Sequence, residues 1–311
     1  METSPDILIY GSGALACLFA YQLAEAGLQV SLLDRWLEGV TAIKTRGMRR
    51  QSESHMPASQ KVNASTRPED FSNIPLAIVL VKSWQTSQAA ADLAACLAPN
   101  GLALTLQNGL GNLEILGSTL GARRAAVGTT TYGATLLNPG VFRPGGMGIV
   151  TISANLQSSP MAAHLLHAGF QLAFTSNLDG LLWAKLIINA AVNPLTALLE
   201  VPNGQLLQHP HAWQLVVSSV HEAVAAARSL NITLPNPEPL AEVEEVIRRT
   251  GSNQSSMLQD ILRGAPTEID AITGALLSAA AAVNLPLPTH QTLFHLVKCK
   301  IAARQATPIN Q

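Results

Sequence analysis

Several features that mark particular classes of protein are rare in this sequence. Charged residues make up only 13% of the 311 residues, and 19 basic side chains are balanced by 20 acidic ones. Without a basic excess, the chain lacks the surface by which many proteins bind nucleic acid or anionic membranes, so we expect neither partner. The low charge, together with 48% hydrophobic residues, also excludes a disordered chain and indicates a compact fold.

Cysteine is scarce as well, since Cys17, Cys96 and Cys299 are widely separated and have no further companions. Their number and spacing fit neither a disulfide framework nor a metal site, and they favour a reducing compartment. The histidines do not indicate a metal site either: His164 and His167, for example, have no acidic or cysteine partner at a typical ligand spacing. We therefore expect surface histidines and no bound metal.

Targeting signals are not recognisable either. The first residues, Met1 to Asp6, are acidic and run directly into a strand-like segment, unlike a signal peptide. No apolar stretch is long and uninterrupted enough to predict a membrane span. By elimination the sequence predicts a cytoplasmic protein, and it leaves open whether the chain forms a homodimer.

The first half of the chain alternates short apolar runs with helical patterns. The runs at 7–10, 30–33, 76–81 and 102–106 are typical of buried strands, and helical patterns follow at 14–26, up to 43, and 87–97. This alternation predicts βαβ units and a Rossmann-type, doubly wound parallel sheet. Residues 123–152 are strand-like and rich in Gly and Thr, and we expect antiparallel strands at the sheet edge.

From about residue 178 the pattern changes to long helices rich in Ala and Leu. We expect helices at 178–199, 211–230, 239–250, 267–283 and 289–304, separated by turn clusters. The sequence thus predicts an α/β domain at 1–176 followed by an all-α domain at 177–311.

A glycine-rich loop follows the first predicted strand. The segment Gly11-Ser12-Gly13-Ala14-Leu15-Ala16 has the G-x-G-x-x-A spacing of a dinucleotide-binding turn. Gly11 allows the tight turn, Gly13 lets the backbone approach a pyrophosphate, and Ala16 packs helix against strand. The free N–H groups and the positive dipole end of the following helix would attract the anion. This context, at the end of a strand and the start of a helix, predicts nucleotide binding.

The choice of nicotinamide cofactor depends on two adjacent residues at the end of the second strand. Asp34 could accept hydrogen bonds from an adenosine ribose, which favours NAD(H), whereas Arg35 could bind a 2′-phosphate, which favours NADP(H). The residues alone do not decide between the two.

Three polar residues share one face of the first helix in the second half. Lys185, Asn189 and Asn193 are spaced so that each step turns by only ~40° around a helix. A cation and two amides on an otherwise apolar helix require polar partners, which a substrate carboxylate and carbonyl would supply. A structural lysine with two structural amides is the alternative.

Several segments together resemble the ketopantoate reductase (2-dehydropantoate 2-reductase) family, in order and over nearly the whole chain. Besides the loop at 11–16 and the stripe that begins at Lys185, they are Val81-Lys82-Ser83-Trp84-Gln85-Thr86, Gln107-Asn108-Gly109-Leu110-Gly111-Asn112, Asn193-Pro194-Leu195-Thr196-Ala197, Ser255-Ser256-Met257-Leu258-Gln259-Asp260 and Thr267-Glu268-Ile269-Asp270. The motifs of the second half are the most specific.

The resemblance implies roles for residues of the second domain. Lys185 would be the general acid that protonates the carbonyl oxygen while hydride arrives from the nicotinamide, and its charge would stabilise the developing alkoxide. Glu268 would bind the substrate hydroxyl, help orient the lysine and lie at the cofactor. Ser256 would donate to the substrate carboxylate, and Asn189 and Asn193 would hold the polar ends of the substrate.

The resemblance also implies cofactor contacts in the first domain. Asn108, after the fourth predicted strand, would touch both cofactor and substrate. Lys82 and Gln85, after the third, match positions near the phosphate of the adenosine, which favours NADP(H). Asp34, next to the family-type Arg35, departs from the pattern and leaves NAD(H) open.

The sequence therefore predicts a reductase that converts 2-dehydropantoate to pantoate in pantothenate biosynthesis, with hydride from NADPH. A reductase of the same family acting on another small 2-keto acid is the first alternative. A non-enzymatic NADP(H)-sensing module is the second, although a sensor has no need of a proton donor paired with a carboxylate.

Overall fold

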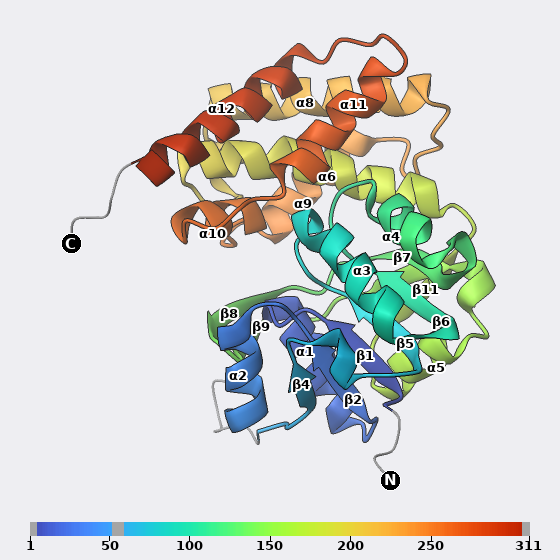
Figure 1. The fold of residues 1–311 in the computed structure, drawn as a ribbon. Helices are drawn as coiled ribbons and strands as arrows, with labels where there is room; N and C mark the ends of the chain where they lie inside the picture. Colours follow the sequence, from blue (N-terminus) through green and yellow to red (C-terminus); the bar gives the residue numbers. More distant parts are fainter. Residues whose placement is uncertain (1–4, 52–58, 307–311) are drawn as a thin grey trace. The chain divides into compact units, whose positions relative to one another are not determined.

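The computed structural model describes residues 5–51 and 59–306, and the chain divides into two compact units (Figure 1). The first unit consists of Met1–Gln107 and Asn112–Leu178. The second consists of Asp179–Gln311 together with the short segment Asn108–Gly111. Four residues of the connection after strand β6 thus belong to the second unit, although the chain on both sides of them belongs to the first.

The first unit is built around an eight-stranded sheet in the described part of the chain, with strand order β11-β10-β7-β6-β5-β1-β2-β4. The strands from β4 to β7 in this order are parallel, whereas β10 runs antiparallel to β7 and parallel to β11. The sheet strands are β1 (Ile7–Tyr10), β2 (Val30–Leu33), β4 (Asn63–Ser65), β5 (Ile74–Val79), β6 (Leu97–Thr105), β7 (Ala125–Thr130), β10 (Val150–Ser153) and β11 (Leu172–Thr175). This confirms the predicted parallel sheet.

The sheet is covered on both faces because its central strands are apolar on both sides. Along β1, Ile7 and Ile9 point into one hydrophobic core and Leu8 and Tyr10 into another. Helices α1 (Ala14–Glu25), α2 (Leu37–Arg46) and α5 (Pro160–His167) contribute to the first core. Helices α3 (Thr86–Cys96) and α4 (Asn112–Leu120) contribute to the second, and they lie side by side (Figure 1). The alternation along each strand thus produces the doubly wound arrangement.

The region 123–152 is more varied than expected. Strand β10 is antiparallel to its neighbour β7, as predicted, but β7 continues the parallel sheet. Strands β8 (Ala134–Asn138) and β9 (Val141–Pro144) form a hairpin that joins β3 (Arg49–Arg50) in a separate three-stranded sheet. The sequence pattern identifies strands here, but strand partners depend on contacts with residues far away in the chain.

The second unit is helical, as predicted, and its core surrounds α6 (Leu178–Leu199). By length and composition α6 could cross a membrane, contrary to our expectation, but 67% of its most apolar window is buried inside the fold. The other helices are α7 (Gln205–Gln208), α8 (Pro210–Ser229), α9 (Pro239–Arg249), α10 (Ser256–Leu262), α11 (Ala275–Ala281) and α12 (Pro288–Ala306). The predicted helix at 267–283 contains a π-helical turn, η5 (Asp270–Gly274), directly before α11.

Candidate active site

The glycine-rich loop lies between β1 and α1, as its spacing predicts. Gly11 has φ +127°, a conformation that favours glycine, and its N–H donates to the carbonyl of Leu33 at 2.8 Å. Gly13 is the N-cap of α1, and no side-chain hydrogen bond caps this helix. Ala16 is fully buried against the sheet. The loop therefore presents the uncapped N-terminus of a helix, which is where a dinucleotide pyrophosphate binds.

The position of Gly13 fits an anion in a specific way. Its φ of −71° is accessible to any residue, so the backbone conformation does not require glycine. A β-carbon added at Gly13 would meet no protein atom within 4 Å. The space beside the α-carbon is thus open, as expected where a ligand, and not the protein, would approach the backbone.

Asp34 lies at the end of β2 and is 4% exposed. Both the backbone N–H and the hydroxyl of Ser12 donate to its Oδ2, the former at 2.7 Å. Its Oδ1 accepts the N–H of Trp36 at 3.3 Å. The carboxylate therefore holds the glycine-rich loop against β2, which is a structural use that the sequence alone does not reveal.

The neighbouring Arg35 points elsewhere. Its side chain is 46% exposed, and its guanidinium binds both carboxylate oxygens of Asp92 in α3. The adjacent residues Asp34 and Arg35 thus have separate partners, one on the loop and one on a helix. Asp92 is missing from the sequence prediction because a single acidic residue within a helical pattern carries no signal of its own.

Two further predicted cofactor residues lie just before α3: Lys82 precedes the 3₁₀ turn η2 (Ser83–Gln85), and Gln85 is its last residue. Both residues follow β5. A buried hydrogen-bond network lies beside them, in which Gln107 donates through Nε2 to the Val81 carbonyl and to the Thr86 hydroxyl, both at 2.9 Å. This network joins the carboxyl ends of β5 and β6, the edge at which such sheets bind ligands. The role of Gln107 was not predicted.

The second unit carries the predicted substrate residues. Lys185, Asn189 and Asn193 all lie on α6, and Asn193 is buried. Glu268 is 5% exposed and accepts a hydrogen bond from Asn108 Nδ2 at 3.2 Å. The structure therefore brings together residues that are 160 positions apart in the sequence.

Lys185 is electrostatically coupled to the same carboxylate. Burial lowers the pKa of Lys185, the negative charge of Glu268 raises it in part, and the result is about 8. A lysine with a pKa close to neutral can release a proton far more readily than an exposed one. Asn108, Lys185 and Glu268 thus form a cluster suited to proton transfer.

The two adjacent serines at α10 have different roles. Ser255 is the N-cap of this helix: its hydroxyl accepts the N–H of Leu258 at 3.1 Å and the hydroxyl of Thr196 at 2.7 Å. Ser256, the predicted substrate residue, is the first residue of the helix and is half-buried. Because Ser255 is buried and Ser256 is half-buried, Ser256 is the more accessible serine of the pair.

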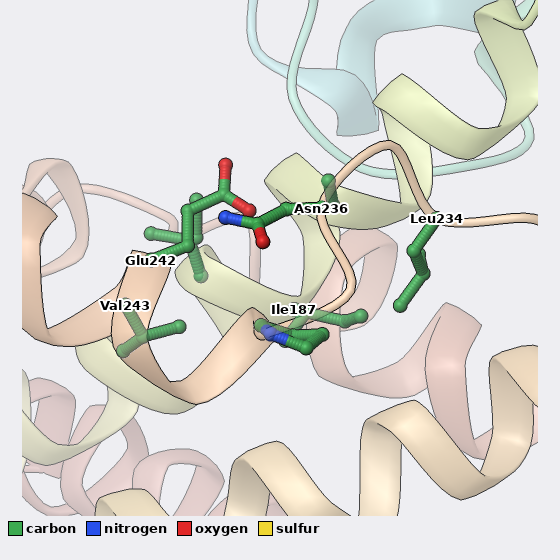
Figure 2. Close-up of a pocket in the computed structure, with 8 residues that line it drawn as sticks. Ile187, Leu234, Asn236, Glu242 and Val243 are labelled. Atoms are coloured by element: carbon green, nitrogen blue, oxygen red, sulfur yellow. The ribbon is translucent and has the colours of Figure 1, made fainter.

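A small hollow on another side of α6 does not belong to this cluster. Figure 2 shows it between α6 and α9, with the side chains of Asn236 and Glu242 pointing toward one another. Its empty volume is about 200 Å³, and Ala184, Ile187 and Ile188 of α6 line it, none of them in the polar stripe. This space does not hold even a water-sized sphere, so the hollow is a packing feature.

Comparison with known proteins identifies the family. The family model described as Ketopantoate reductase PanE/ApbA matches residues 7–157, and the model of its C-terminal domain matches residues 177–300. Curated relatives named 2-dehydropantoate 2-reductase include those of Halobacterium salinarum, 31% identical over 94% of this chain and 97% of the relative, and Pyrococcus horikoshii, 34% identical over 94% and 97%.

Solved structures agree. A PanE/ApbA family ketopantoate reductase from Ralstonia eutropha has a TM-score of 0.89 at 31% identity, covering 96% of this chain and 99% of that one. D-mandelate dehydrogenase in a ternary complex with NADH and anilino(oxo)acetate has a TM-score of 0.89 at 26% identity, with the same coverage. With both family models matched and relatives above 30% identity over almost the full length, this chain belongs to the ketopantoate reductase family of oxidoreductases.

Proposed function

We propose that this chain is an NADP-dependent 2-dehydropantoate 2-reductase, which reduces ketopantoate to pantoate in pantothenate biosynthesis. The names of its relatives support the reaction. The single observation that carries the proposal is the cluster of Lys185, Glu268 and Asn108, in which a lysine with a pKa of about 8 is coupled to a buried carboxylate. Such a perturbed pair is typical of a catalytic site.

In this reaction a carbonyl becomes a hydroxyl by gaining a hydride and a proton. When bound, the nicotinamide supplies the hydride to the carbonyl carbon. The ammonium group of Lys185 donates the proton to the carbonyl oxygen, and before transfer its charge stabilises the negative charge that develops there. The charge of Glu268 opposes the effect of burial on the pKa of Lys185, so most lysine side chains remain protonated at neutral pH.

The remaining residues would hold the substrate. Glu268 would accept the hydrogen bond of the substrate hydroxyl, and Asn108, which donates to Glu268, would keep the carboxylate oriented. Ser256 would donate to the substrate carboxylate, while Asn189 and Asn193 would bind its other polar atoms. Holding the carbonyl carbon and oxygen in one orientation is a large part of the rate enhancement such a site can provide.

The proposed cofactor is NADP(H), bound through the loop Gly11–Ala16 with Arg35 and Lys82 at the 2′-phosphate and Gln85 nearby. The structural role of Asp34 supports this choice, because its carboxylate already binds Ser12 and is almost fully buried. NAD(H) is the alternative, since the similar D-mandelate dehydrogenase structure contains NADH. Binding constants for NADPH and NADH decide between them.

The test of the reaction is NADPH oxidation, followed by absorbance, with a panel of 2-keto acids that includes 2-dehydropantoate and phenylglyoxylate. We expect 2-dehydropantoate to have the highest kcat/KM. A preference for phenylglyoxylate would instead favour the second candidate, a 2-keto acid reductase resembling D-mandelate dehydrogenase. Cofactor binding without turnover of any keto acid would favour the sensing module and contradict the proposal.

The role of Lys185 predicts a separate result. Lys185→Ala should lower kcat by ~100- to 10,000-fold, the usual contribution of a general acid, with little change in NADPH affinity. Glu268→Ala should mainly raise KM, and the effects of the two substitutions should not add. A purely structural lysine would behave differently: Lys185→Ala would lower Tm and leave kcat per folded molecule within a factor of about 3, below the general-acid range.

A further inference from the structure

In the first unit, side chains from three parts of the chain donate hydrogen bonds to one buried carboxylate, that of Asp92 in α3. Tyr10 donates its hydroxyl to Oδ2 at 2.6 Å, and Gln88 donates through Nε2 to Oδ1 at 2.9 Å. Arg35 donates through Nε to Oδ2 at 2.8 Å and through Nη2 to Oδ1. The Asp92 side chain is 4% exposed and that of Arg35 is 46% exposed, so the buried partner holds the exposed one.

This carboxylate is ionised in the folded protein. Burial raises the pKa of Asp92, but the hydrogen bonds from Arg35, Tyr10 and Gln88 outweigh it and bring the pKa below 3.8. An ion pair between a buried carboxylate and a half-exposed guanidinium contributes little net stability, because desolvation of the carboxylate and solvent screening of the guanidinium offset their attraction. The Asp92–Arg35 pair is therefore better explained by what it does to the arginine than by the stability it adds.

The arginine it holds is the one placed at the cofactor. Arg35 directly follows Asp34 at the end of β2, one strand away from the glycine-rich loop after β1. An unrestrained arginine must lose several side-chain rotations when it binds a phosphate. Here Asp92 uses the N–H of Nε and one N–H of Nη2, which leaves the two N–H groups of Nη1 and the second N–H of Nη2 for an anion.

We propose that Asp92 is a positioning residue that determines cofactor selectivity: it fixes the Arg35 guanidinium in the orientation that binds the 2′-phosphate of NADP(H). The proposal rests on the NADP(H) preference proposed above. Tyr10 and Gln88 act on the carboxylate, Tyr10 from β1 and Gln88 from the preceding turn of α3, and hold it in one rotamer.

Asp92 has a second effect of opposite sign, because its charge offsets that of Arg35. Since the guanidinium is about half exposed, solvent and salt screen its interaction with a phosphate, which reduces this effect. We therefore expect the loss of orientation to outweigh the gain in net positive charge when Asp92 is neutralised. The two effects predict opposite changes in NADPH affinity.

The test measures Kd for NADPH and NADH by calorimetry, in the absence of substrate, for the wild type and for Asp92→Asn, Gln88→Ala and Arg35→Ala. We expect Asp92→Asn to weaken NADPH binding on the order of tenfold and to leave NADH binding unchanged. Gln88→Ala removes one donor to Asp92 but keeps the ion pair, so the NADPH-to-NADH affinity ratio should fall less than in Asp92→Asn. If Asp92→Asn does not fold, Asp92→Glu keeps the charge, displaces the carboxylate and should also reduce the ratio.

The outcomes separate the two proposals. If Arg35→Ala leaves the NADPH-to-NADH affinity ratio unchanged, Arg35 does not bind the 2′-phosphate and the cofactor proposal itself fails. If Arg35→Ala lowers the ratio but Asp92→Asn leaves it unchanged or raises it, the cofactor proposal stands and the positioning role of Asp92 is overturned. A drop in Tm for Asp92→Asn with an unchanged ratio also overturns it, because that is the result of a merely structural role.

Discussion

At the scale of single residues, the proposed proton transfer depends on two opposing influences on Lys185. Burial disfavours its charged form, whereas Glu268 favours it, and the balance leaves the pKa at about 8. Either influence alone would give a poorer acid for work near neutral pH: burial alone would leave less of the lysine protonated, and an exposed lysine would release its proton less readily.

This balance predicts a pH profile. In the proposed mechanism the protonated lysine is the active form, so kcat/KM should fall as pH rises through about 8. Glu268→Gln removes the charge that raises the pKa of Lys185, so the fall should move to lower pH. Glu242→Gln is the control, since Glu242 lies at the hollow beside α6 but does not contribute to the shift (Figure 2). A profile that stays in place in Glu268→Gln would contradict the coupling.

Gly13 makes a second residue-scale prediction. Gly13→Ala should fold normally, since its β-carbon meets no protein atom within 4 Å. It should bind NADPH much more weakly, because the β-carbon would occupy the place proposed for the pyrophosphate. Gly13→Val should abolish binding. Gly117→Ala in α4 is a matched control, with its nearest atom 3.8 Å away. Calorimetry measures the affinity for NADPH, and Tm shows whether each variant is folded. Wild-type affinity in a folded Gly13→Val protein would rule out the loop as the phosphate site.

At the scale of elements, the segment Asn108–Gly111 is attached to the π-helical turn η5. The N–H of Leu110 donates to the carbonyl of Ala271 at 3.1 Å. A β-carbon at Gly109, which has φ +86°, would lie 2.3 Å from that same carbonyl oxygen. π-Helical turns often occur at functional sites, and this one follows Glu268 and accepts the segment that carries Asn108.

The attachment predicts a difference between two glycines. Gly109→Ala and Gly111→Ala introduce similar backbone strain, at φ +86° and +89°, but only the first collides with η5, since Gly111 has open space around it. We expect Gly109→Ala to displace Asn108 from Glu268 and to lower kcat/KM ~10- to 100-fold more than Gly111→Ala. Adding Asn108→Ala to Gly109→Ala should then lower kcat/KM only slightly further.

Hydrogen exchange at the Leu110 amide gives a readout that does not depend on turnover. Protection should be lost in Gly109→Ala and retained in Gly111→Ala, because only the former breaks the bond to Ala271. Equal exchange in both variants would show that the close approach to η5 does not hold the segment.

At the scale of the whole molecule, stability should depend on one buried histidine. His290, near the start of α12, is fully buried, which corrects the expectation of surface histidines. Its Nε2 lies 2.9 Å from the Ser219 carbonyl, while Nδ1 has no hydrogen-bond partner among the described residues. Burial lowers the pKa of His290, only partly offset by the bond to Ser219 and the charge of Glu222.

The sign of the effect follows from the lowered pKa. The neutral form is favoured in the folded state, so the contribution of His290 is complete above the ordinary value of 6.5 and is lost as pH falls below it. The free energy of unfolding should therefore drop below that pH by at most ~1.4 kcal/mol per pH unit for this group. Urea unfolding should show a shallower drop in His290→Gln, while His295→Gln, an exposed position on the same helix, should match the wild type.

The order of elements follows from the sequence because it is a local property. Apolar runs with turn residues between them predict β1, β2 and β5, and helical periodicity predicts α6, α8, α9 and α12, all found within a few residues of the expected positions. The glycine spacing at 11–16 and the polar stripe from Lys185 are likewise local, so the candidate loop and helix were recognisable before the fold was known.

Only the tertiary structure decided what the side chains bind. It directed Asp34 to Ser12 and Arg35 to Asp92, although the two are adjacent, and it joined Asn108 to Glu268. It also joined β8 and β9 to β3 in a separate sheet and inserted the π-helical turn η5 in a helix expected to be regular. The physical reason is the same in each case: hydrogen-bond partners and strand neighbours are set by residues tens to hundreds of positions away, whereas periodicity and turn chemistry record only the nearest few.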